Sequence, residues 1–386
     1  MAKLVPLGEI AEIVSGGTPK SSVPEYWDGE IAWASPKDLS SLNGKFIEST
    51  NRKITKEGLM SSSAKLLPPN SVLFSSRAPI GLVAINSVPM ATNQGFKSLI
   101  PGSDLIADYL YWWLIMNREM LNDLGTGATF KEISKRVIAD VAIPLPPLEE
   151  QTKISKALDQ TQILIRNQKH ILRCYDEFLL STFQKLFPNG SFQRVRLAET
   201  VDQKSVITYG IVQAGEHDPD GVQYIRTGDI YEGHIIQEKL LRTSPAISQK
   251  YSRTILKEGD IVMSIRATVG TTAKVDKSLV GANLSRGLAR ISPSEHFVSE
   301  YILYALRSPA SQNWISGNVK GATFPEITLA KLRELPLEAP PLEKQAQFSK
   351  IVNSVNNLKA HYQDNIKAHQ QLLNSIFHSN TCNGSS

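Results

Sequence analysis

The fold of this chain is decided by PPLEEQTKISKALDQTQILIRNQKHILRCYDEFLLSTFQKL at residues 146–186 and by PPLEKQAQFSKIVNSVNNLKAHYQDNIKAHQQLLNSIF at residues 340–377. After the opening prolines, each stretch runs to its end without proline or glycine. Proline is tolerated at a helix start, and Glu149 and Glu150 favour the positive end of a helix dipole. Pro188, just after the first stretch, would end a helix. Each stretch therefore predicts one long helix.

Along both stretches, seam residues recur with a spacing that averages 3.5 residues. The apolar ones include Ile154, Leu158, Ile165, Leu172, Leu179, Phe348, Val352, Val355, Ile366 and Leu373. Such spacing is typical of helices that wrap one another. The alternative is an ordinary amphipathic helix that lies on its own domain. Two stretches of matching length favour helices that pack together.

The chain also repeats itself. GATF occurs at residues 127–130 and again at 321–324, and this pair has the same offset as PPLEEQ and PPLEKQ. Further upstream, LFSSRAPIGLVA at 73–84 matches VMSIRATVGTTA at 262–273. Ordered matches of this kind indicate two copies of one domain, with loops of different length.

Each copy begins with a region of turn signals and short β-branched runs, which predicts short strands with a few helices. Tyr109–Leu121 and Tyr301–Leu306 are helix candidates near the end of these regions. The predicted fold class is α+β. The predicted division is a first domain at 1–145, a helix at 146–188, a second domain at 189–339, a helix at 340–379 and a disordered tail at 380–386.

Composition narrows the function classes. The 386 residues are 41% hydrophobic and carry a net charge of +5, which allows packed cores and weakly favours a polyanion as partner. The two cysteines, Cys174 and Cys382, have no metal-type spacing, so we expect no metal site and a reducing, cytoplasmic setting. No segment is apolar for long enough to cross a bilayer, and no membrane partner is expected.

Catalytic motifs are missing from the sequence. It contains no P-loop, no Asn/Asp-Pro-Pro-Tyr string, and no HExxH, CxxC or GxSxG motif. His369 falls in the second helix seam, where packing explains it better than a ligand role. We therefore expect no catalytic residues and no cofactor bound by this chain.

Several strings closely resemble the specificity subunits of type I restriction-modification systems. They are LGEIAEIVSGGTPK at 7–20, IAWASPKDL at 31–39, SSRAPIG at 75–81, TNQGFKSL at 92–99, and the GAT and PPLEEQ strings. The second half matches less closely, with ANLSRGL at 282–288 in place of the NQGFKSL string.

The resemblance implies two target recognition domains and two helices that form an antiparallel coiled coil. It also implies two modification (methyltransferase) subunits docked on this scaffold, with S-adenosylmethionine bound by them, and restriction subunits in the full complex. The DNA target would be double-stranded and bipartite. A 39-residue helix would be roughly 58 Å long at ~1.5 Å per residue, so the helices could set the spacer between half-sites.

The duplication suggests where DNA is read. Features shared by both halves cannot alone distinguish two different half-sites, so differing loops are the candidates for base contacts. The candidate DNA-binding residues are Thr18, Lys20, Tyr26, Ser35, Lys37, Arg77, Asn93, Gln94, Thr129, Lys131, Lys204, Tyr209, Arg226, Thr227, Arg266, Asn283, Ser285, Arg286 and Thr323.

Each of these candidates also has a structural interpretation. Arg77 and Arg266 lie in equivalent turns and either contact phosphate or brace the turn. The sequence pairs Asn93 with Asn283, which either contact DNA or cap turns, and turn capping is favoured. In the GATF strings, Thr129 and Thr323 either offer a hydroxyl to DNA or start a helix, with Phe130 and Phe324 buried.

Two other functions remain open at this point. A self-contained nuclease would cut DNA when the purified chain is given magnesium. A pure assembly scaffold would bind DNA without sequence preference, even in its complex.

Overall fold

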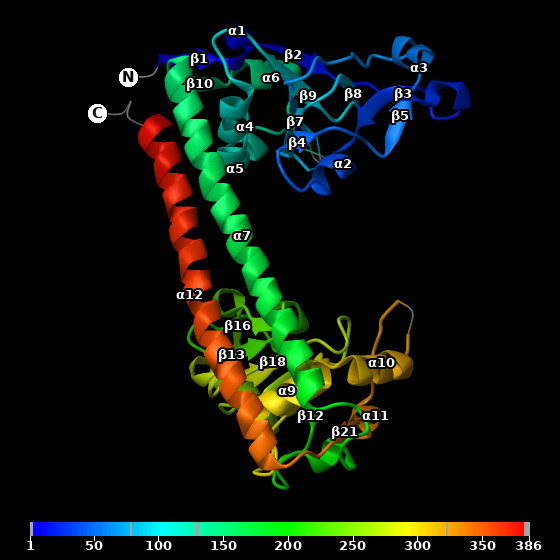
Figure 1. Cartoon of the computed structure of the whole chain (residues 1–386), viewed down its shortest axis with the longest axis vertical. Helices are drawn as coiled ribbons and strands as arrows, with labels where there is room; N and C mark the ends of the chain where they lie inside the picture. The colour runs from blue at the N-terminus through cyan, green and yellow to red at the C-terminus, as the bar shows by residue number, and fades with distance from the viewer. Residues whose placement is uncertain (1–2, 78, 128–130, 322, 382–386) are drawn as a thin grey trace. The chain divides into compact units, whose positions relative to one another are not determined.

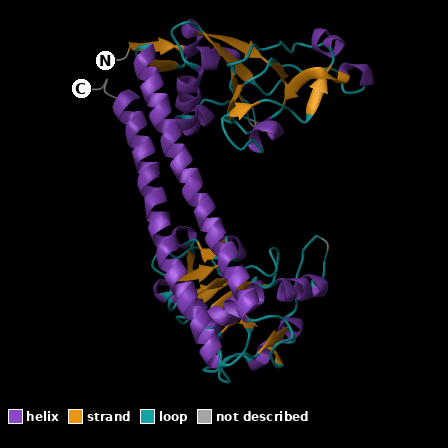
Figure 2. Cartoon of the chain, viewed as in Figure 1, coloured by secondary structure: helices purple, strands orange, loops and turns teal. Residues whose placement is uncertain are grey.

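The computed structural model describes residues 3–77, 79–127, 131–321 and 323–381, and it falls into two compact units. Unit 1 comprises Met1–Gln168 and Asp364–Ser386, and unit 2 comprises Lys169–Gln363. Both units mix helices with short strands, which confirms the predicted α+β class (Figure 2). Each long helix is divided between the units and does not form a separate body, because each half of a helix packs mainly with the domain beside it.

Unit 1 is built on one five-stranded sheet, in the order β2-β9-β6-β7-β4, and one three-stranded sheet, in the order β5-β3-β8. Its strands are β1 (Lys3–Pro6), β2 (Ala11–Ser15), β3 (Trp27–Ala34), β4 (Phe46–Ile47), β5 (Arg52–Ile54), β6 (Val72–Phe74), β7 (Val83–Asn86), β8 (Met90–Thr92), β9 (Lys97–Pro101) and β10 (Ala142–Leu145). Its shorter helices are α1 (Leu7–Ile10), α2 (Pro36–Ser40), α3 (Lys56–Met60), α4 (Ala107–Met116), α5 (Arg118–Asp123) and α6 (Lys135–Asp140).

Unit 2 contains a four-stranded sheet, in the order β12-β20-β17-β18, and a three-stranded sheet, in the order β16-β13-β19. Its strands are β11 (Arg194–Arg196), β12 (Thr208–Tyr209), β13 (Val222–Ile225), β14 (Ile230–Tyr231), β15 (His234–Ile235), β16 (Leu241–Thr243), β17 (Ile261–Ser264), β18 (Thr272–Lys274), β19 (Asn283–Leu284), β20 (Leu288–Ile291) and β21 (Pro336–Glu338). Its shorter helices are α8 (Pro245–Lys250), α9 (Ser299–Arg307), α10 (Pro309–Asn318) and α11 (Leu329–Arg333).

The sheets of the two units correspond strand for strand. In each small sheet the central strand pairs in parallel with the strand that leads into a conserved turn: β3 with β8, and β13 with β19. In each large sheet a helix packs on the equivalent strand, α4 on β7 and α9 on β18 (Figure 1). Unit 1 adds β4 at a sheet edge, whereas unit 2 adds the β14–β15 hairpin. The duplication inferred from the sequence is therefore a duplication of the fold.

The long helices are α7 (Leu148–Leu186) and α12 (Leu342–Thr381). The ten apolar seam residues named from the sequence are buried except Leu172, which is half-buried, as are Leu186 and Ile376 at the ends of the predicted seams. Within unit 2 the two helices meet in opposite directions. The rings of Phe183 and Phe348 lie 5.4 Å apart between centroids, and those of Tyr175 and Tyr362 lie 5.9 Å apart. The pairing is therefore antiparallel in this unit.

A buried glutamine ties the start of each long helix to its domain. The Oε1 atom of Gln151 accepts a hydrogen bond from the N–H of Ile106 at 2.9 Å, and its Nε2 donates to the carbonyls of Asp104 and Pro146, both at 2.8 Å. In unit 2, Gln345 makes the same three bonds with Val298, His296 and Pro340 at 2.9, 3.2 and 2.8 Å. The PPLE(E/K)Q string thus serves as a clamp between helix and domain.

Two predicted boundaries need correction. The helix expected over Tyr109–Leu121 is two helices that meet at Asn117, whose side-chain Nδ2 donates to the carbonyl of Trp113 at 2.8 Å and helps to end α4. The predicted disordered tail begins too early, because the backbone of α12 stays helical to Thr381. Residues 382–386 lie outside the described part of the chain.

Among the described residues, no helix has the length and apolar character needed to cross a membrane. The same residues contain no group of three or more His, Cys, Asp or Glu side chains placed to hold a metal ion.

Candidate nucleic-acid interface

Each unit carries the same four-residue turn just after β8 or β19. In unit 1 the N–H of Asn93 donates to Ala34, the last residue of β3, at 2.9 Å, and the turn closes from Phe96 N–H to the Asn93 carbonyl at 3.2 Å. In unit 2 the N–H of Ser285 donates to Ile225 at 2.8 Å, and the turn closes from Leu288 to Ser285 at 3.1 Å. Residues 93–96 therefore correspond to residues 285–288.

This correspondence corrects the sequence alignment, which paired Asn93 with Asn283. The structural partner of Asn93 is Ser285, and the partner of Gln94 is Arg286. Asn283 lies two residues earlier, fully buried in β19, where its Oδ1 accepts from the Thr254 hydroxyl at 2.7 Å. A buried and internally bonded amide has no free surface for DNA, so the structure argues against Asn283 as a DNA contact.

Asn93 itself shows the turn-capping geometry that the sequence favoured. Its Oδ1 accepts a hydrogen bond from the N–H of Gly95 at 2.9 Å. The next side chain, Gln94, is exposed, and its Oε1 accepts a hydrogen bond from the hydroxyl of Thr18. Arg77 and Pro36 also lie against this turn, because a side chain at Gly95 would approach both. Unit 1 thus gathers three of its predicted segments, represented by Thr18, Pro36 and Arg77, around one turn.

The loop after β2, which supplies Thr18, can approach this turn only because it begins with a glycine. A Cβ atom on Gly16 would lie 1.9 Å from the carbonyl oxygen of Asn93. In unit 2, a Cβ atom on Gly210 would lie 1.9 Å from the carbonyl oxygen of Leu284. The second half therefore keeps the glycine of the SGGTP string. Sequence comparison missed it because only one residue of that string survives, in Tyr209-Gly210.

The equivalence of Arg77 and Arg266 is upheld by their backbone pairing, since each forms an isolated bridge with a glutamate, Glu132 or Glu326. Their side chains differ. Arg266 forms an ion pair with Glu326 at 2.8 Å and so braces its turn. In unit 1, Glu132 instead faces Lys97 at 3.3 Å. Within the described residues, no hydrogen bond or ion pair holds the exposed Arg77 guanidinium, which leaves it available to phosphate.

A second loop beside each turn is held by an aspartate. Asp38 accepts hydrogen bonds from the N–H and hydroxyl of Ser35, at 2.9 and 2.6 Å. Asp229 takes the same place in unit 2 but holds Arg226 instead, through the backbone N–H at 2.9 Å and two guanidinium bonds at 3.0 and 2.9 Å. One carboxylate position thus supports a small hydroxyl in one unit and an arginine in the other.

These aspartates have well-defined electrostatics. Burial opposes ionisation of Asp38, but hydrogen bonds from Asn51 and Ser35 outweigh it and hold the pKa of Asp38 below its usual value of 3.8. The hydrogen bonds that the Arg226 guanidinium donates to Asp229 raise the pKa of Arg226 above that of a free arginine. Both loops are therefore fixed by charged groups near neutral pH.

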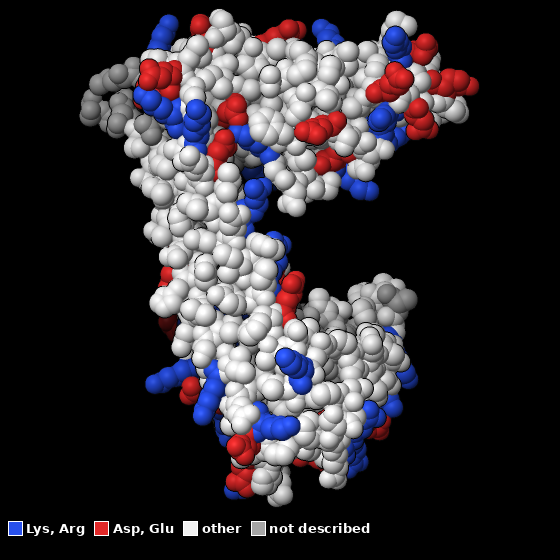
Figure 3. Space-filling view, in the orientation of Figure 1, with Lys and Arg blue, Asp and Glu red and all other residues white. Residues whose placement is uncertain are grey.

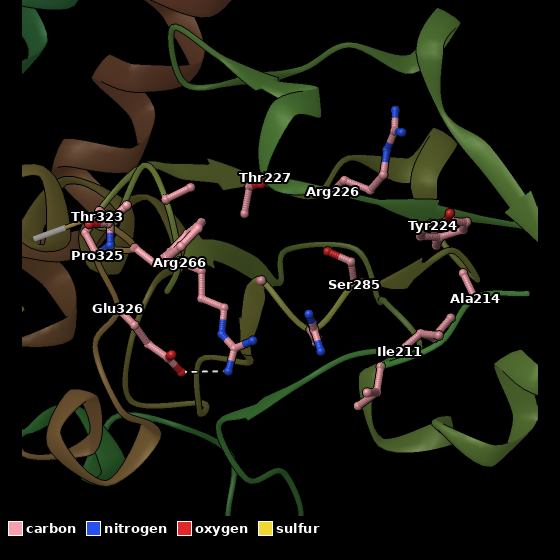
Figure 4. A pocket seen from close by; sticks show the side chains of 15 residues that line it. Ile211, Ala214, Tyr224, Arg226, Thr227, Arg266, Ser285, Thr323, Pro325 and Glu326 are labelled. Carbon is pink, nitrogen blue, oxygen red and sulfur yellow. Dashed lines mark hydrogen bonds and ion pairs between the residues drawn. The ribbon is translucent and has the colours of Figure 1, made fainter. Parts of the chain in front are cut away.

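In unit 2 the turn and its neighbours line a cavity of about 710 Å³. Six of the predicted residues line it: Arg226, Thr227, Arg266, Ser285, Arg286 and Thr323. Figure 4 shows that they come from separate loops, with the ion pair of Arg266 and Glu326 on one side and Arg226 on another. Sequence reasoning missed the apolar part of the lining, such as Ile211 and Val212, because isolated apolar residues in a loop carry no signal of their own.

Other predicted residues lie away from these clusters or serve other roles. Tyr26 packs partly buried against the tryptophan core of the small sheet, and Lys131 faces Asp123 at 4.0 Å. The remaining exposed candidates, for which the structure offers no further test, are Lys20, Lys37, Lys204 and Tyr209.

The GATF strings give one correction. Phe324, expected to be buried, is 85% exposed, because it sits in the loop that borders the cavity of unit 2. Thr323 is exposed beside it. Thr129 and Phe130 lie outside the described residues.

On the face drawn in Figure 3, both basic and acidic side chains occur on each unit. The net charge of the whole chain is +5.

Comparison with known proteins relates both the sequence and the fold of this chain to one protein family. The sequence pattern of the type I restriction modification DNA specificity domain matches residues 2–173 and 204–369. The specificity subunit of type I restriction enzyme MjaIX from Methanocaldococcus jannaschii is 28% identical over 374 residues, covering 90% of this chain and 86% of that protein.

Solved structures agree in fold. A chain from a structure that describes complex assembly and conformational transition of a type I R-M system aligns with a TM-score of 0.59 and 18% identity, over 98% of this chain and 97% of its own length. The type I S subunit from M. genitalium aligns with a TM-score of 0.52 and 13% identity, over 98% and 96%.

Proposed function

Since the chain belongs to the type I restriction modification DNA specificity family and carries that domain twice, we propose that it selects the DNA sequence for a type I restriction-modification complex. Each unit reads one half of a bipartite site on double-stranded DNA. The chain itself supplies no catalysis. The reaction and its S-adenosylmethionine belong to methyltransferase subunits, and cleavage belongs to restriction subunits that join them in the cytoplasm.

One observation carries this proposal. The two units repeat one turn with equivalent backbone hydrogen bonds at its start and at its close, but present Gln94 in one copy and Arg286 in the other. Shared backbone with unlike outward side chains is what two different half-sites require, because phosphate contacts position a protein while base contacts specify sequence.

The test is methylation mapping. The chain is expressed with its modification subunit in a host that lacks DNA methylation, and the genome is sequenced for modified bases. We expect a split motif with two unlike half-sites, and no modification when this chain is omitted. If the assembled complex methylates DNA without any motif, the chain is an assembly scaffold and not a reader.

The long helices support a second part of the proposal, that they set the spacer and dock the methyltransferases. Seven residues inserted in each helix at the unit boundaries, after Gln168 and after Gln363, preserve the 3.5-residue seam and add ~10.5 Å of helix. We expect the unread spacer to lengthen by roughly three base pairs at ~3.4 Å each, with both half-sites unchanged. The same insertion after Gly44, in an exposed loop, serves as control, and an unchanged spacer in the helix variant would refute this role.

A further inference from the structure

We propose that Gln94 and Arg286 are equivalent base-reading residues, and that Gln94 selects an adenine in one half-site while Arg286 selects a guanine in the other. This inference rests on the proposed function and deepens it, since it assigns a base to each unit. It starts from position, because both residues are the second member of the same closed turn.

The turn is a rigid platform for a side chain. In both units the carbonyl of the following glycine accepts a backbone hydrogen bond, from Ser76 to Gly95 at 2.8 Å and from Ile265 to Gly287 at 2.9 Å. The residues after these glycines, Phe96 and Leu288, are fully buried. Gln94 and Arg286 are exposed between these anchored neighbours. Such an anchored backbone lowers the entropic cost of placing one side chain in a groove.

Among the three arginines that line the unit 2 cavity, Arg286 is the one whose guanidinium is not held by a described acidic residue. Arg226 is held by Asp229 and Arg266 by Glu326, whereas the described residues offer no hydrogen bond or ion pair to the Arg286 guanidinium. A guanidinium presents parallel N–H donors that match the O6 and N7 acceptors of guanine, which is the commonest specific contact in the major groove. The free arginine in this cluster is therefore the one suited to read a base.

Gln94 has the complementary chemistry. Its amide offers one donor and one acceptor edge, which matches N7 and the N6 amino group of adenine. The Thr18 hydroxyl donates to Oε1 and orients the amide, and a carbonyl oxygen has a second lone pair that remains available for adenine. In unit 2 the position of Thr18 is occupied by the exposed Val212, which has no hydroxyl to bond the side chain of the turn.

The experiment compares methylation motifs of four complexes, each containing the full-length chain and its modification subunits. They carry the wild-type chain, Gln94→Arg, Arg286→Gln, or the control Arg194→Gln, which changes an exposed arginine of unit 2 outside the cavity. We expect the wild-type motif to contain an A·T pair in one half-site and a G·C pair in the other. Arg286→Gln should change the preference at one G·C position only, by roughly 5- to 150-fold, and Gln94→Arg should do so at one A·T position in the opposite half-site.

The outcomes separate the two proposals. If the wild-type complex yields no split motif, the proposed function fails and this inference fails with it. If the motif is split but both variants leave it unchanged, or lower methylation of all sequences alike, then these side chains contact phosphate or nothing, and only the base assignment is overturned. The control Arg194→Gln should give the wild-type motif, because Arg194 lies outside the cavity. In each of the other variants, the half-site that belongs to the unchanged unit serves as an internal standard.

Discussion

In unit 1 the turn after β8 carries Gln94, and the neighbouring loop carries Ser35 on Asp38. In unit 2 the same turn carries Arg286, and the same aspartate position holds Arg226. The tyrosine contacts behind these loops do not differ, since Tyr109 of α4 donates to the Pro144 carbonyl of β10 at 2.9 Å and Tyr301 of α9 to the Glu338 carbonyl of β21 at 2.6 Å. The two copies thus share internal hydrogen bonds and differ in the side chains that face outward.

The largest expected effect is a loss of stability at the helix seam, where matching residues of the two repeats differ in size. Phe348 is fully buried against the rings of Phe183 and Tyr304, and the same seam place in unit 1 holds Ile154. Phe348→Ala should lower the free energy of unfolding by about 3–5 kcal/mol, through lost burial and a cavity. Urea denaturation measures this. The control is Phe178→Ala, a half-exposed phenylalanine on α7, the other long helix, and an equal loss in both variants would show that the seam is not the core.

Loss of either glutamine clamp should lower the free energy of unfolding by less than Phe348→Ala does, and by a similar amount in both units. Gln151→Leu or Gln345→Leu leaves a backbone N–H, of Ile106 or Val298, without its acceptor. We expect each change to lower unfolding free energy by about 1–3 kcal/mol, the cost of a buried unsatisfied donor. Gln160→Leu, at an exposed position of α7, controls for the new side chain. A clear effect in only one unit would mean that the clamps are not equivalent.

The third comparison concerns one polar place in the seam. Lys359 is buried and bonds Asp176 at 2.6 Å, whereas the matching seam residue in the first repeat is Ile165. Removing the acid strands a buried ammonium, while removing the lysine leaves a carboxylate that is 45% exposed to water. Asp176→Ala should therefore destabilise the chain by about 1–3 kcal/mol, and Lys359→Ile by less than about 1 kcal/mol. The reverse order in thermal or urea unfolding would contradict this picture.

The smallest effect is a dependence of stability on pH that arises from Asp38 in unit 1. The pKa of Asp38 is lowered in the folded chain, so its stabilising contribution is fully present above its usual pKa of 3.8 and is lost as pH falls through the folded-state pKa. Asp38→Asn should destabilise the chain at pH 6, and the difference from wild type should shrink below pH 4. Unfolding free energies measured from pH 6 to pH 3 test this, and a difference that grows on acidification would reverse the assigned sign.

The sequence alone was sufficient for the repeat, the α+β class and the two helices, because these depend on local signals. A stretch without proline or glycine and a 3.5-residue spacing are visible in one dimension. The family resemblance rested on contiguous strings such as LGEIAEIVSGGTPK, and the matched residues 2–173 and 204–369 bear it out.

What only the tertiary structure decided was the register of the second recognition loop. A string match paired Asn93 with Asn283, but strand pairing places Ser285 there and buries Asn283, because hydrogen bonds to Ile225 and not residue identity fix the turn. The exposure of Phe324 and the pairing of Arg266 with Glu326 likewise depend on contacts between distant segments. Local sequence determines which elements form, whereas packing between them determines which side chains remain free to bind.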